Sequence, residues 1–358
     1  MRICFIAAGT FTHIGSYLDY FNQAGHEVHF VSLSPSPKRS VQTYNLGIGK
    51  KYSETQGKWK YPISMLRVRK ILNKIKPDII HAHYATSAGL TALVSGFHPS
   101  VVTVHGSDLT VGIKSMIWRP ILKKIFNYAD CINVVSDDLS EMVLSLGIDK
   151  RKIKTFTLGI DTEKYSFTQK SEIEKSHPLK LVCTRRLEPV FDHFTIIDAL
   201  ALLKEKGIRF QMTFVGGGSL LNRMKQKVND LGLAESVNFL GKIPNDDLPE
   251  ILSKQDIYLS TSLWDGASLS LLEAMAIGLI PVVSDIKANS AWIEDGVDGF
   301  LHKVGDSKEL ADCIIKLFNN PVIVNKASLN NRKKVTEKAD RNTNMKLLES
   351  VYKDLIKK

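Results

Sequence analysis

The most informative stretch of the sequence is residues 264–285, which read Trp-Asp-Gly-Ala-Ser-Leu-Ser-Leu-Leu-Glu-Ala-Met-Ala-Ile-Gly-Leu-Ile-Pro-Val-Val-Ser-Asp. It predicts a glycine-containing loop, a helix that Gly278 ends, and a buried strand. Glu273 falls in the first turns of the helix, so its carboxylate can reach a ligand held against the free N–H groups of the helix N-terminus. A carboxylate there suits sugar hydroxyls. The alternative is a capping box, because Ser270 and Glu273 have the Ser-x-x-Glu spacing.

The same alternation of β-branched runs and longer helical patterns occurs along the whole chain, which is typical of parallel α/β units. The predicted strands form two sets, at residues 2–8, 27–33, 78–83, 100–105, 131–136 and 153–158, and at residues 179–184, 210–215, 237–240, 257–261 and 279–284. The polar segment 166–178 is the best linker candidate. The sequence therefore predicts two doubly wound sheets, in a first domain over residues 1–168 and a second over residues 176–339, followed by a helix over about residues 340–358.

The composition is that of an ordinary globular protein, since 44% of the 358 residues are hydrophobic and 24% are charged. No run approaches the roughly 18 apolar residues of a membrane span, and the short apolar run after Arg2 lacks a cleavage site, so we expect a cytoplasmic protein. The formal net charge of +11 favours an anionic partner. The chain lacks the patterns of nucleic-acid-binding proteins, and we expect no nucleic-acid partner.

Basic residues concentrate between Lys50 and Lys76, where nine Lys and Arg accompany one acid, Glu54. This stretch is either a solvated loop and helix face or a surface for an anionic membrane or a phosphate-bearing acceptor. Residues 117–126 form a second candidate, because they predict a basic amphipathic helix. Such a helix can lie on an anionic membrane, or its apolar side chains simply bury it against the sheet.

Polar and small residues follow several predicted strands, at the sheet edge where open α/β proteins bind ligands. His105 and Asp108 follow one strand, and Asp108 can support this loop, meet an acceptor or cap the next helix. Gly9 and Thr10 end the first strand, where small residues let backbone donors approach a phosphate or an acceptor. The glycines lack the Gly-x-Gly-x-x-Gly spacing of a dinucleotide oxidoreductase.

His81 and His83 flank Ala82 at another strand end, and they are either metal ligands or side chains that line the ligand site. No cysteine lies near them in the sequence, and the chain has no Asp-x-Asp motif. We therefore expect no metal.

The stretch from Asp265 resembles the E-x7-E signature of the retaining glycosyltransferases with the GT-B fold, glycosyltransferase family 4-like, since seven residues separate Asp265 from Glu273. Further matching motifs are His105-Gly106-Ser107-Asp108, Gly159-Ile160-Asp161, Arg186-Leu187 and Val215-Gly216-Gly217-Gly218. The resemblance covers most of the chain. It implies two facing Rossmann-like domains with parallel sheets, and a C-terminal helix that crosses back to the first domain. It also implies transfer from a nucleotide diphosphate sugar with retained anomeric configuration and without a metal or other cofactor.

Carried over to this sequence, the resemblance assigns donor-sugar hydroxyls to Asp265 and ribose hydroxyls to Glu273. Arg186 corresponds to the arginine that binds the diphosphate, and a planar guanidinium suits two phosphate oxygens. His105 corresponds to a histidine close to the donor sugar at the reaction centre. The implied donor site also includes Gly9, Gly217 and the backbone N–H groups of Ala267, Ser268 and Leu269.

Two positions depart from the family pattern. Asp265 stands where most members have Glu, which shortens the side chain by one methylene and bears on sugar preference. Phe191 stands where members usually have a Lys, five positions after Arg186. The chain is then either a subgroup with a different set of diphosphate cations, in which Arg185 is a substitute or a salt-bridge partner, or a catalytically impaired sugar-nucleotide-binding protein. A sugar-nucleotide epimerase on the same fold is a further alternative.

The resemblance and the basic first domain together predict the partners. They are a nucleotide sugar and a glycan or lipid-linked acceptor, in the synthesis of a cell-surface polysaccharide. An anionic membrane surface is a further predicted partner, with the protein peripheral at the inner face of the plasma membrane.

Overall fold

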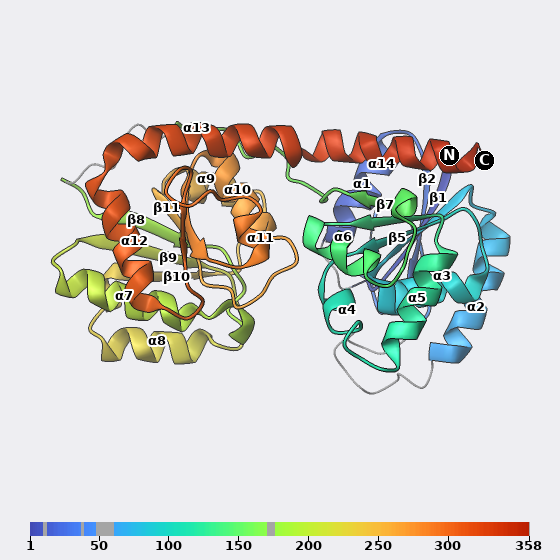
Figure 1. The fold of residues 1–358 in the computed structure, drawn as a ribbon, viewed down its shortest axis with the longest axis horizontal. Coiled ribbons are helices and arrows are strands. Elements are labelled where there is room, and N and C mark those ends of the chain that lie inside the picture. The colour runs from blue at the N-terminus through green and yellow to red at the C-terminus, as the bar shows by residue number, and fades with distance from the viewer. Residues whose placement is uncertain (10–12, 37–38, 48–60, 170–175, 358) are drawn as a thin grey trace. The chain divides into compact units, whose positions relative to one another are not determined.

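A computed structural model describes residues 1–9, 13–36, 39–47, 61–169 and 176–357 of the chain. These residues divide into two units, of which unit 1 is Met1–Leu158 with Asn342–Lys358 and unit 2 is Gly159–Arg341. Each unit contains a wholly parallel sheet (Figure 1), which confirms the predicted α/β fold of two Rossmann-like domains. None of the helices in the described part of the chain is long and apolar enough to span a membrane.

The sheet of unit 1 has seven strands in the order β3-β2-β1-β4-β5-β6-β7. They are β1 (Arg2–Ala7), β2 (Glu27–Ser32), β3 (Gln42–Asn45), β4 (Ile79–His83), β5 (Ser100–Val104), β6 (Cys131–Val134) and β7 (Ile153–Thr155). Six of these strands match predicted runs. The edge strand β3 was not predicted, because its sequence Gln-Thr-Tyr-Asn lacks an apolar run and none of its residues is fully buried.

Helices cover both faces of this sheet (Figure 1). They are α1 (His13–Gln23), α2 (Tyr61–Ile75), α3 (Leu90–Ser95), α4 (Ser107–Thr110), α5 (Trp118–Tyr128), α6 (Asp137–Leu144) and α14 (Arg341–Ile356), with a π-helix, η2, at Tyr84–Gly89 and a 3-10 turn, η3, at Lys150–Lys152. One apolar core joins α2, α3, α5 and α6 to the sheet. On the opposite face, α1 and α14 pack around Phe5 of β1 and His81 of β4.

The C-terminal helix α14 belongs to unit 1, as the family resemblance implies. Tyr352 of α14 is fully buried, its ring stacks on Phe21 at 5.3 Å between centroids, and its hydroxyl lies 2.5 Å from His81 Nδ1. Asn344 Nδ2 donates to the carbonyl oxygen of Thr157 at 2.9 Å. These buried contacts make the last turns of the chain part of the first domain's core.

The sheet of unit 2 has six strands in the order β10-β9-β8-β11-β12-β13. They are β8 (Leu179–Cys183), β9 (Phe210–Val215), β10 (Val237–Gly241), β11 (Ile257–Ser260), β12 (Ile280–Ser284) and β13 (Phe300–His302). The edge strand β13 was not predicted, since it has only three residues. The other five match predicted runs.

Unit 2 also carries helices on both faces of its sheet. They are α7 (His193–Glu205), α8 (Leu221–Asp230), α9 (Leu248–Ser253), α10 (Leu269–Ile277), α11 (Lys287–Ser290), α12 (Ser307–Asn319) and α13 (Pro321–Lys338), with 3-10 turns η4 (Pro189–Phe191) and η5 (Ala234–Ser236). Leu181 packs with α7, α8 and α12, whereas its neighbour Val182 packs with α9, α10 and α13. This alternation along β8 gives each face of the sheet its own core.

Unit 2 begins earlier than the predicted second domain. The N–H of Ile160 donates to the carbonyl oxygen of Ala339, and the N–H of Arg341 donates to that of Ile160. Thr168 N–H likewise donates to the carbonyl oxygen of Ile277 at the end of α10. Residues 159–168, which the sequence assigned to the first domain, are therefore held by backbone bonds within unit 2.

Candidate functional site

Arg185 follows β8, and its guanidinium bonds three side chains at the carboxyl end of the unit 2 sheet. Its Nη2 donates to Asp265 Oδ2 at 2.5 Å, and its Nη1 donates to Oγ of Ser268 and of Ser270, each at 3.0 Å. The two side chains of the ion pair are only 11% and 16% exposed. Arg185 therefore fixes the loop after β11 to the loop after β8, as one of the two predicted alternatives requires.

Phe191 lies directly against this cation. The guanidinium carbon of Arg185 stands 4.2 Å from the centroid of the Phe191 ring, which is cation–π geometry. The turn that carries Phe191 is held by its carbonyl oxygen, which accepts a hydrogen bond from Thr261 Oγ1 at 3.1 Å. Phe191, which stands where the family usually has a lysine, thus packs against the positive charge of Arg185.

Asp265 and the start of α10 form a loop with free backbone donors. Asp265 Oδ1 accepts from the N–H of Gly266 at 2.8 Å, while Ser268 is the N-cap of α10 and accepts from the N–H of Leu271 at 3.3 Å. Within the described residues, no hydrogen-bond acceptor meets the backbone N–H groups of the three positions predicted to bind the donor. These positions are Ala267, Ser268 and Leu269.

Glu273 lies one turn further along α10 and is not part of a capping box. Its Oε1 accepts a hydrogen bond from the hydroxyl of Tyr165 at 2.9 Å, whereas Ser270 Oγ bonds the Tyr258 hydroxyl and Arg185. Burial raises the pKa of Glu273 to about 7, and the Tyr165 hydrogen bond works in the opposite direction. Burial thus favours the protonated form of the Glu273 carboxyl more than is usual for a glutamate.

Arg186 points away from this ion pair. Its side chain is 77% exposed, and its contact with Glu188 Oε1 is long, at 3.5 Å. Glu188 itself accepts from the hydroxyl of Ser219 at 2.6 Å, and the backbone oxygen of Arg186 accepts from His193 Nε2 at 2.8 Å. The backbone of Arg186 is fixed while its guanidinium is available to a ligand.

The glycine run after β9 contacts the same loop. The N–H of Leu187 donates to the carbonyl oxygen of Gly217, and the N–H of Leu220 donates to that of Leu187. A Cβ at Gly218 would stand 2.2 Å from the Leu187 oxygen, so only glycine permits this approach. Gly217 therefore lies beside Arg185 and Arg186, although its carbonyl group rather than its N–H makes the bond.

His105 follows β5 in unit 1 and is surrounded by rings. Its Nε2 lies 3.1 Å from His83 Nδ1, and its ring stacks on Tyr84 at 4.5 Å and lies 4.6 Å from the ring of His13. Tyr84 has a positive φ of 75°, an uncommon conformation for a side chain of this size. Strain of this kind is found most often at functional sites.

Asp108 supports the loop that carries His105. Its carboxylate accepts from three backbone N–H groups, those of Ala85 at 2.7 Å, Gly106 at 2.9 Å and His105 at 3.2 Å. Burial raises the pKa of Asp108, and these hydrogen bonds lower it. Of the predicted alternatives, loop support is the one found, because the carboxylate ties the end of β4 to the end of β5.

Gly9 ends β1 at the same edge of the unit 1 sheet. Its N–H donates to Ser34 Oγ at 3.1 Å, and a Cβ here would stand 2.6 Å from both Ser32 Oγ and Ser36 Cβ. Glycine is therefore required for contact with the neighbouring loop. Thr10, also predicted for this site, lies outside the described residues.

His81 and His83 are buried side chains in the core of unit 1. His81 bonds the hydroxyls of Tyr352 and Thr103, so both of its nitrogens are engaged. No group of three or more His, Cys, Asp or Glu side chains able to hold a metal occurs in the part of the chain that the structure covers. Burial lowers the pKa of His81 to about 3 and that of His13 to about 4, and it lowers the pKa of His83 and His105 well below the ordinary value.

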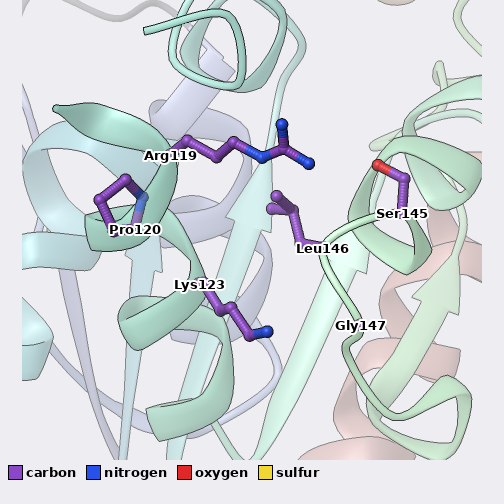
Figure 2. A pocket seen from close by; sticks show the side chains of 6 residues that line it. All are labelled: Arg119, Pro120, Lys123, Ser145, Leu146 and Gly147. Atoms are coloured by element: carbon purple, nitrogen blue, oxygen red, sulfur yellow. The ribbon is translucent and has the colours of Figure 1, made fainter. Parts of the chain in front are cut away.

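The segment before and within α5 carries exposed apolar and basic side chains. Met116 is 94% exposed and Ile117 is 74% exposed, whereas Leu122, Ile125 and Phe126 are buried against the sheet. Figure 2 shows a pocket of about 480 Å³ beside it, with Arg119, Pro120 and Lys123 on α5 opposite Ser145, Leu146 and Gly147. Packing against the sheet thus explains the apolar side chains in the second half of α5. It does not explain the apolar side chain of Ile117, which is exposed.

The basic stretch before residue 76 is only partly described. Four of its described members are exposed on α2 beside the buried side chains of Val68, Leu72 and Ile75: Arg67, Arg69, Lys70 and Lys74. Lys76 is exposed directly after the helix. The four on α2 form a solvated helix face. Lys50, Lys51, Lys58 and Lys60 lie outside the described residues.

Two parallel-sheet units, each with polar side chains at the carboxyl ends of its strands, are typical of the class of GT-B glycosyltransferases. The family "Glycosyl transferases group 1" matches residues 166–341, and "Glycosyltransferase Family 4" matches residues 7–164. The chain therefore contains both domains and is a member of the family 4-like glycosyltransferases.

Individual relatives agree with this assignment. The chain is 26% identical to the UDP-Gal:alpha-D-GlcNAc-diphosphoundecaprenol alpha-1,3-galactosyltransferase of Escherichia coli, over 82% of this chain and 79% of that protein. It is 24% identical to the N-acetyl-alpha-D-glucosaminyl L-malate synthase of Bacillus anthracis, over 99% and 96%. The crystal structure of Anabaena Alr3699/HepE in complex with UDP has the same fold, with a TM-score of 0.79, 19% identity, and coverage of 99% of this chain and 100% of that one.

Proposed function

We propose that this glycosyltransferase transfers a sugar with retained anomeric configuration from a nucleoside diphosphate sugar that unit 2 binds. The observation that carries the proposal is the 265–273 segment, which has a carboxylate at each end and, between them in the chain, backbone N–H groups that meet no acceptor among the described residues. Free N–H groups at a helix N-terminus bind phosphate oxygens, and carboxylates accept hydrogen bonds from sugar and ribose hydroxyls.

Each side chain then has a separate task. Asp265 accepts from hydroxyls of the donor sugar, and Glu273 accepts from the ribose hydroxyls. Arg186, exposed and loosely held, turns to the diphosphate and offsets the charge that develops on the leaving nucleotide. Arg185 keeps Asp265 in place and adds a fixed positive charge, so no metal ion is required for leaving-group departure. His105 of unit 1 offers a ring nitrogen to a sugar hydroxyl.

The acceptor in this proposal is a glycan or lipid-linked sugar that unit 1 binds. The relative from Escherichia coli is named for a diphosphoundecaprenol-linked acceptor, and other relatives are named for amylovoran and colanic acid biosynthesis. These names support a role in the synthesis of a surface polysaccharide.

A thermal-shift panel of nucleoside diphosphates and their sugars tests donor binding first. A ligand at 100 times its dissociation constant adds about 2.7 kcal/mol to stability, so a selective rise in Tm identifies the nucleotide. Transfer to a lipid-linked acceptor, with the anomeric coupling of the product measured by NMR, then tests retention. An inverted product contradicts the retaining mechanism, and a new sugar nucleotide formed without any acceptor indicates an epimerase.

We further propose that unit 1 docks on an anionic membrane through the exposed start of α5. Met116 and Ile117 supply apolar side chains, and Arg119 and Lys123 line the pocket of Figure 2 without an acidic partner among the described residues. Apolar insertion together with cations near lipid phosphates is the usual chemistry of a peripheral membrane surface.

Cosedimentation with vesicles tests this surface. Binding is expected with vesicles that contain phosphatidylglycerol at low salt, and it should weaken at high salt. The double variant Arg119→Gln/Lys123→Gln should lose most of this binding, and the matched variant Lys225→Gln/Lys308→Gln, with the same charge change in unit 2, should retain it. Equal binding by both variants would exclude the α5 surface.

A further inference from the structure

Four imidazoles form a continuous group on one face of the unit 1 sheet. The rings of His81 and His83 stack at 4.3 Å, those of His83 and His105 at 5.3 Å, and those of His105 and His13 lie 4.6 Å apart. His81 and His83 are buried side chains of β4, while His105 is half-buried after β5. The group therefore leads from the core of the unit to the edge where its strands end.

His83 and His105 share a single hydrogen bond, and it engages a different nitrogen on each ring. His83 Nδ1 and His105 Nε2 are 3.1 Å apart. His83 Nε2 is buried without a hydrogen-bond partner in the described part of the unit, and the His83 ring packs against the rings of Tyr17 and His81. His105 Nδ1 has no partner among the described residues either, but it is not enclosed.

Only one proton can lie between the two rings, so two arrangements are possible. If His105 donates from Nε2, His83 must carry its own proton on the buried Nε2, where it meets no acceptor. If His83 donates from Nδ1, its buried Nε2 carries only a lone pair. A buried N–H without an acceptor is the rarer and more costly defect, so the second arrangement is favoured.

The second arrangement determines what His105 presents at the sheet edge. With Nε2 occupied as an acceptor, a neutral His105 carries its proton on Nδ1. That nitrogen is then a hydrogen-bond donor. It suits an acceptor oxygen of a sugar, and it is unable to take a proton from a hydroxyl.

We infer that His83 is a positioning residue of the transfer reaction, which fixes His105 in the Nδ1–H tautomer and so makes it a donor to a sugar oxygen. The inference rests on the proposed role of His105 in sugar binding. Tyr84, stacked on His105, and His13, whose ring lies tilted against it, hold the plane of the ring, and Asp108 holds its backbone. His83 alone among these residues meets a ring nitrogen of His105 in the described structure.

Nitrogen-15 NMR of the histidine rings in the full chain tests the tautomer without any substrate. The two-bond correlation pattern is expected to show Nδ1–H for His105 in the wild type. His98, an exposed imidazole bonded to Asp130, provides the control variant His98→Asn, which should leave the His105 signals unchanged. An Nε2–H pattern for His105 in the wild type overturns the inference, whether or not transfer activity has been found.

Two substitutions at position 83 test the effect on transfer. His83→Phe keeps the ring packing but removes the donor, so the His105 pattern should change and kcat should fall about tenfold. His83→Asn retains an N–H near the position of Nδ1 and should restore most of kcat and the His105 pattern. Wild-type kcat in a folded His83→Phe protein overturns the positioning role. If His83→Phe does not fold, a His83→Asn protein that loses the Nδ1–H pattern overturns it instead.

Discussion

Burial acts in opposite directions on the two sites of this glycosyltransferase. In unit 1 it lowers the pKa of the imidazoles, to about 4 at His13 and about 3 at His81. In unit 2 it raises the pKa of the Glu273 carboxyl to about 7. The physical cause is the same, because loss of water disfavours the charged form of either group. The pKa values of His13 and His81 thus lie well below neutral pH, whereas that of Glu273 lies near it.

The two sites also differ in whether they contain a buried ion pair. Unit 2 holds a buried ion pair between Arg185 and Asp265, braced by Phe191, whereas in unit 1 burial lowers the pKa of His83 and His105 and so disfavours their charged forms. A donor with a diphosphate needs fixed positive charge, and a sugar hydroxyl needs only a hydrogen bond. The comparison therefore assigns any pH effect near neutrality to the donor unit, and this assignment can be tested.

The largest expected effect concerns the exposed cation of unit 2. Arg186→Met should lower kcat by about 10²–10³, the usual cost of removing one donor that stabilises developing charge. Its Tm should not change, because the side chain is 77% exposed. Arg185→Met should lower both kcat and Tm, since it leaves Asp265 buried without its partner. Equal Tm values for the two variants, measured by calorimetry, would contradict the distinction between them.

Glu273→Gln tests whether Glu273 is the group that titrates near neutral pH. At pH 8 it should weaken donor binding by about 10- to 100-fold, because hydrogen bonds to a charged group contribute about 1.5–3 kcal/mol. At pH 6 the wild-type carboxyl is largely protonated, so the two proteins should bind more alike. Titration calorimetry at both pH values measures this, with Glu235→Gln as an exposed control. Wild-type affinity independent of pH between 6 and 8 would exclude Glu273 as the titrating group.

The same variant separates the pH dependence of stability in the two sites. The pKa of Glu273 is raised in the folded state, so its contribution to stability is lost as the pH rises from 4.5 through about 7. The imidazole pKa values are lowered, so their contribution is lost as the pH falls below 6.5. The difference in Tm between Glu273→Gln and wild type should therefore grow from pH 5 to pH 8 by a few degrees, while both proteins lose stability in acid.

A smaller effect is expected at the residue that departs from the family pattern. Phe191→Lys replaces a ring that faces Arg185 at 4.2 Å by a second positive charge, so we expect kcat/KM to fall about tenfold. Phe191→Tyr, which keeps the ring, should retain wild-type kcat/KM. A large gain in rate for Phe191→Lys would instead indicate that the natural chain is an impaired enzyme.

The smallest effect belongs to Tyr165→Phe. This change removes the hydroxyl that donates to Glu273 Oε1, so the pKa of Glu273 should rise further and donor affinity at pH 7 should fall about two- to fivefold. Tyr44→Phe, on the edge strand of unit 1, is the matched control. Unchanged affinity at pH 7 in Tyr165→Phe would show that the hydrogen bond does not set the ionisation of Glu273.

Sequence alone predicted the parts of this molecule that depend on local patterns. Strand β5 and helix α10 follow from apolar runs and from Gly278, and the seven-residue spacing of Asp265 and Glu273 led to the family. The edge strands β3 and β13 were missed because they are short or polar. The capping-box alternative was wrong because Ser268, not Ser270, is the N-cap.

The contacts that define the sites join residues far apart in the chain. Arg185 meets Asp265 across 80 positions, and Tyr165 meets Glu273 across 108. No local pattern in one sequence indicates such pairs, since they depend on which strands become neighbours in the sheet. The His81-Ala-His83 spacing was the available signal for the imidazole group. Its link to His105 required the register of β4 with β5.

The place of α14 in unit 1 bears on the order in which the protein folds during synthesis. Tyr352 and Asn344 complete a core whose other members precede residue 159. The ribosome makes the whole of unit 2 in between, which at 5–20 residues per second takes roughly 10–40 s. Unit 1 is thus begun first and completed last. During that interval the apolar surface that α14 later covers is exposed on the nascent chain, and chaperones have access to it.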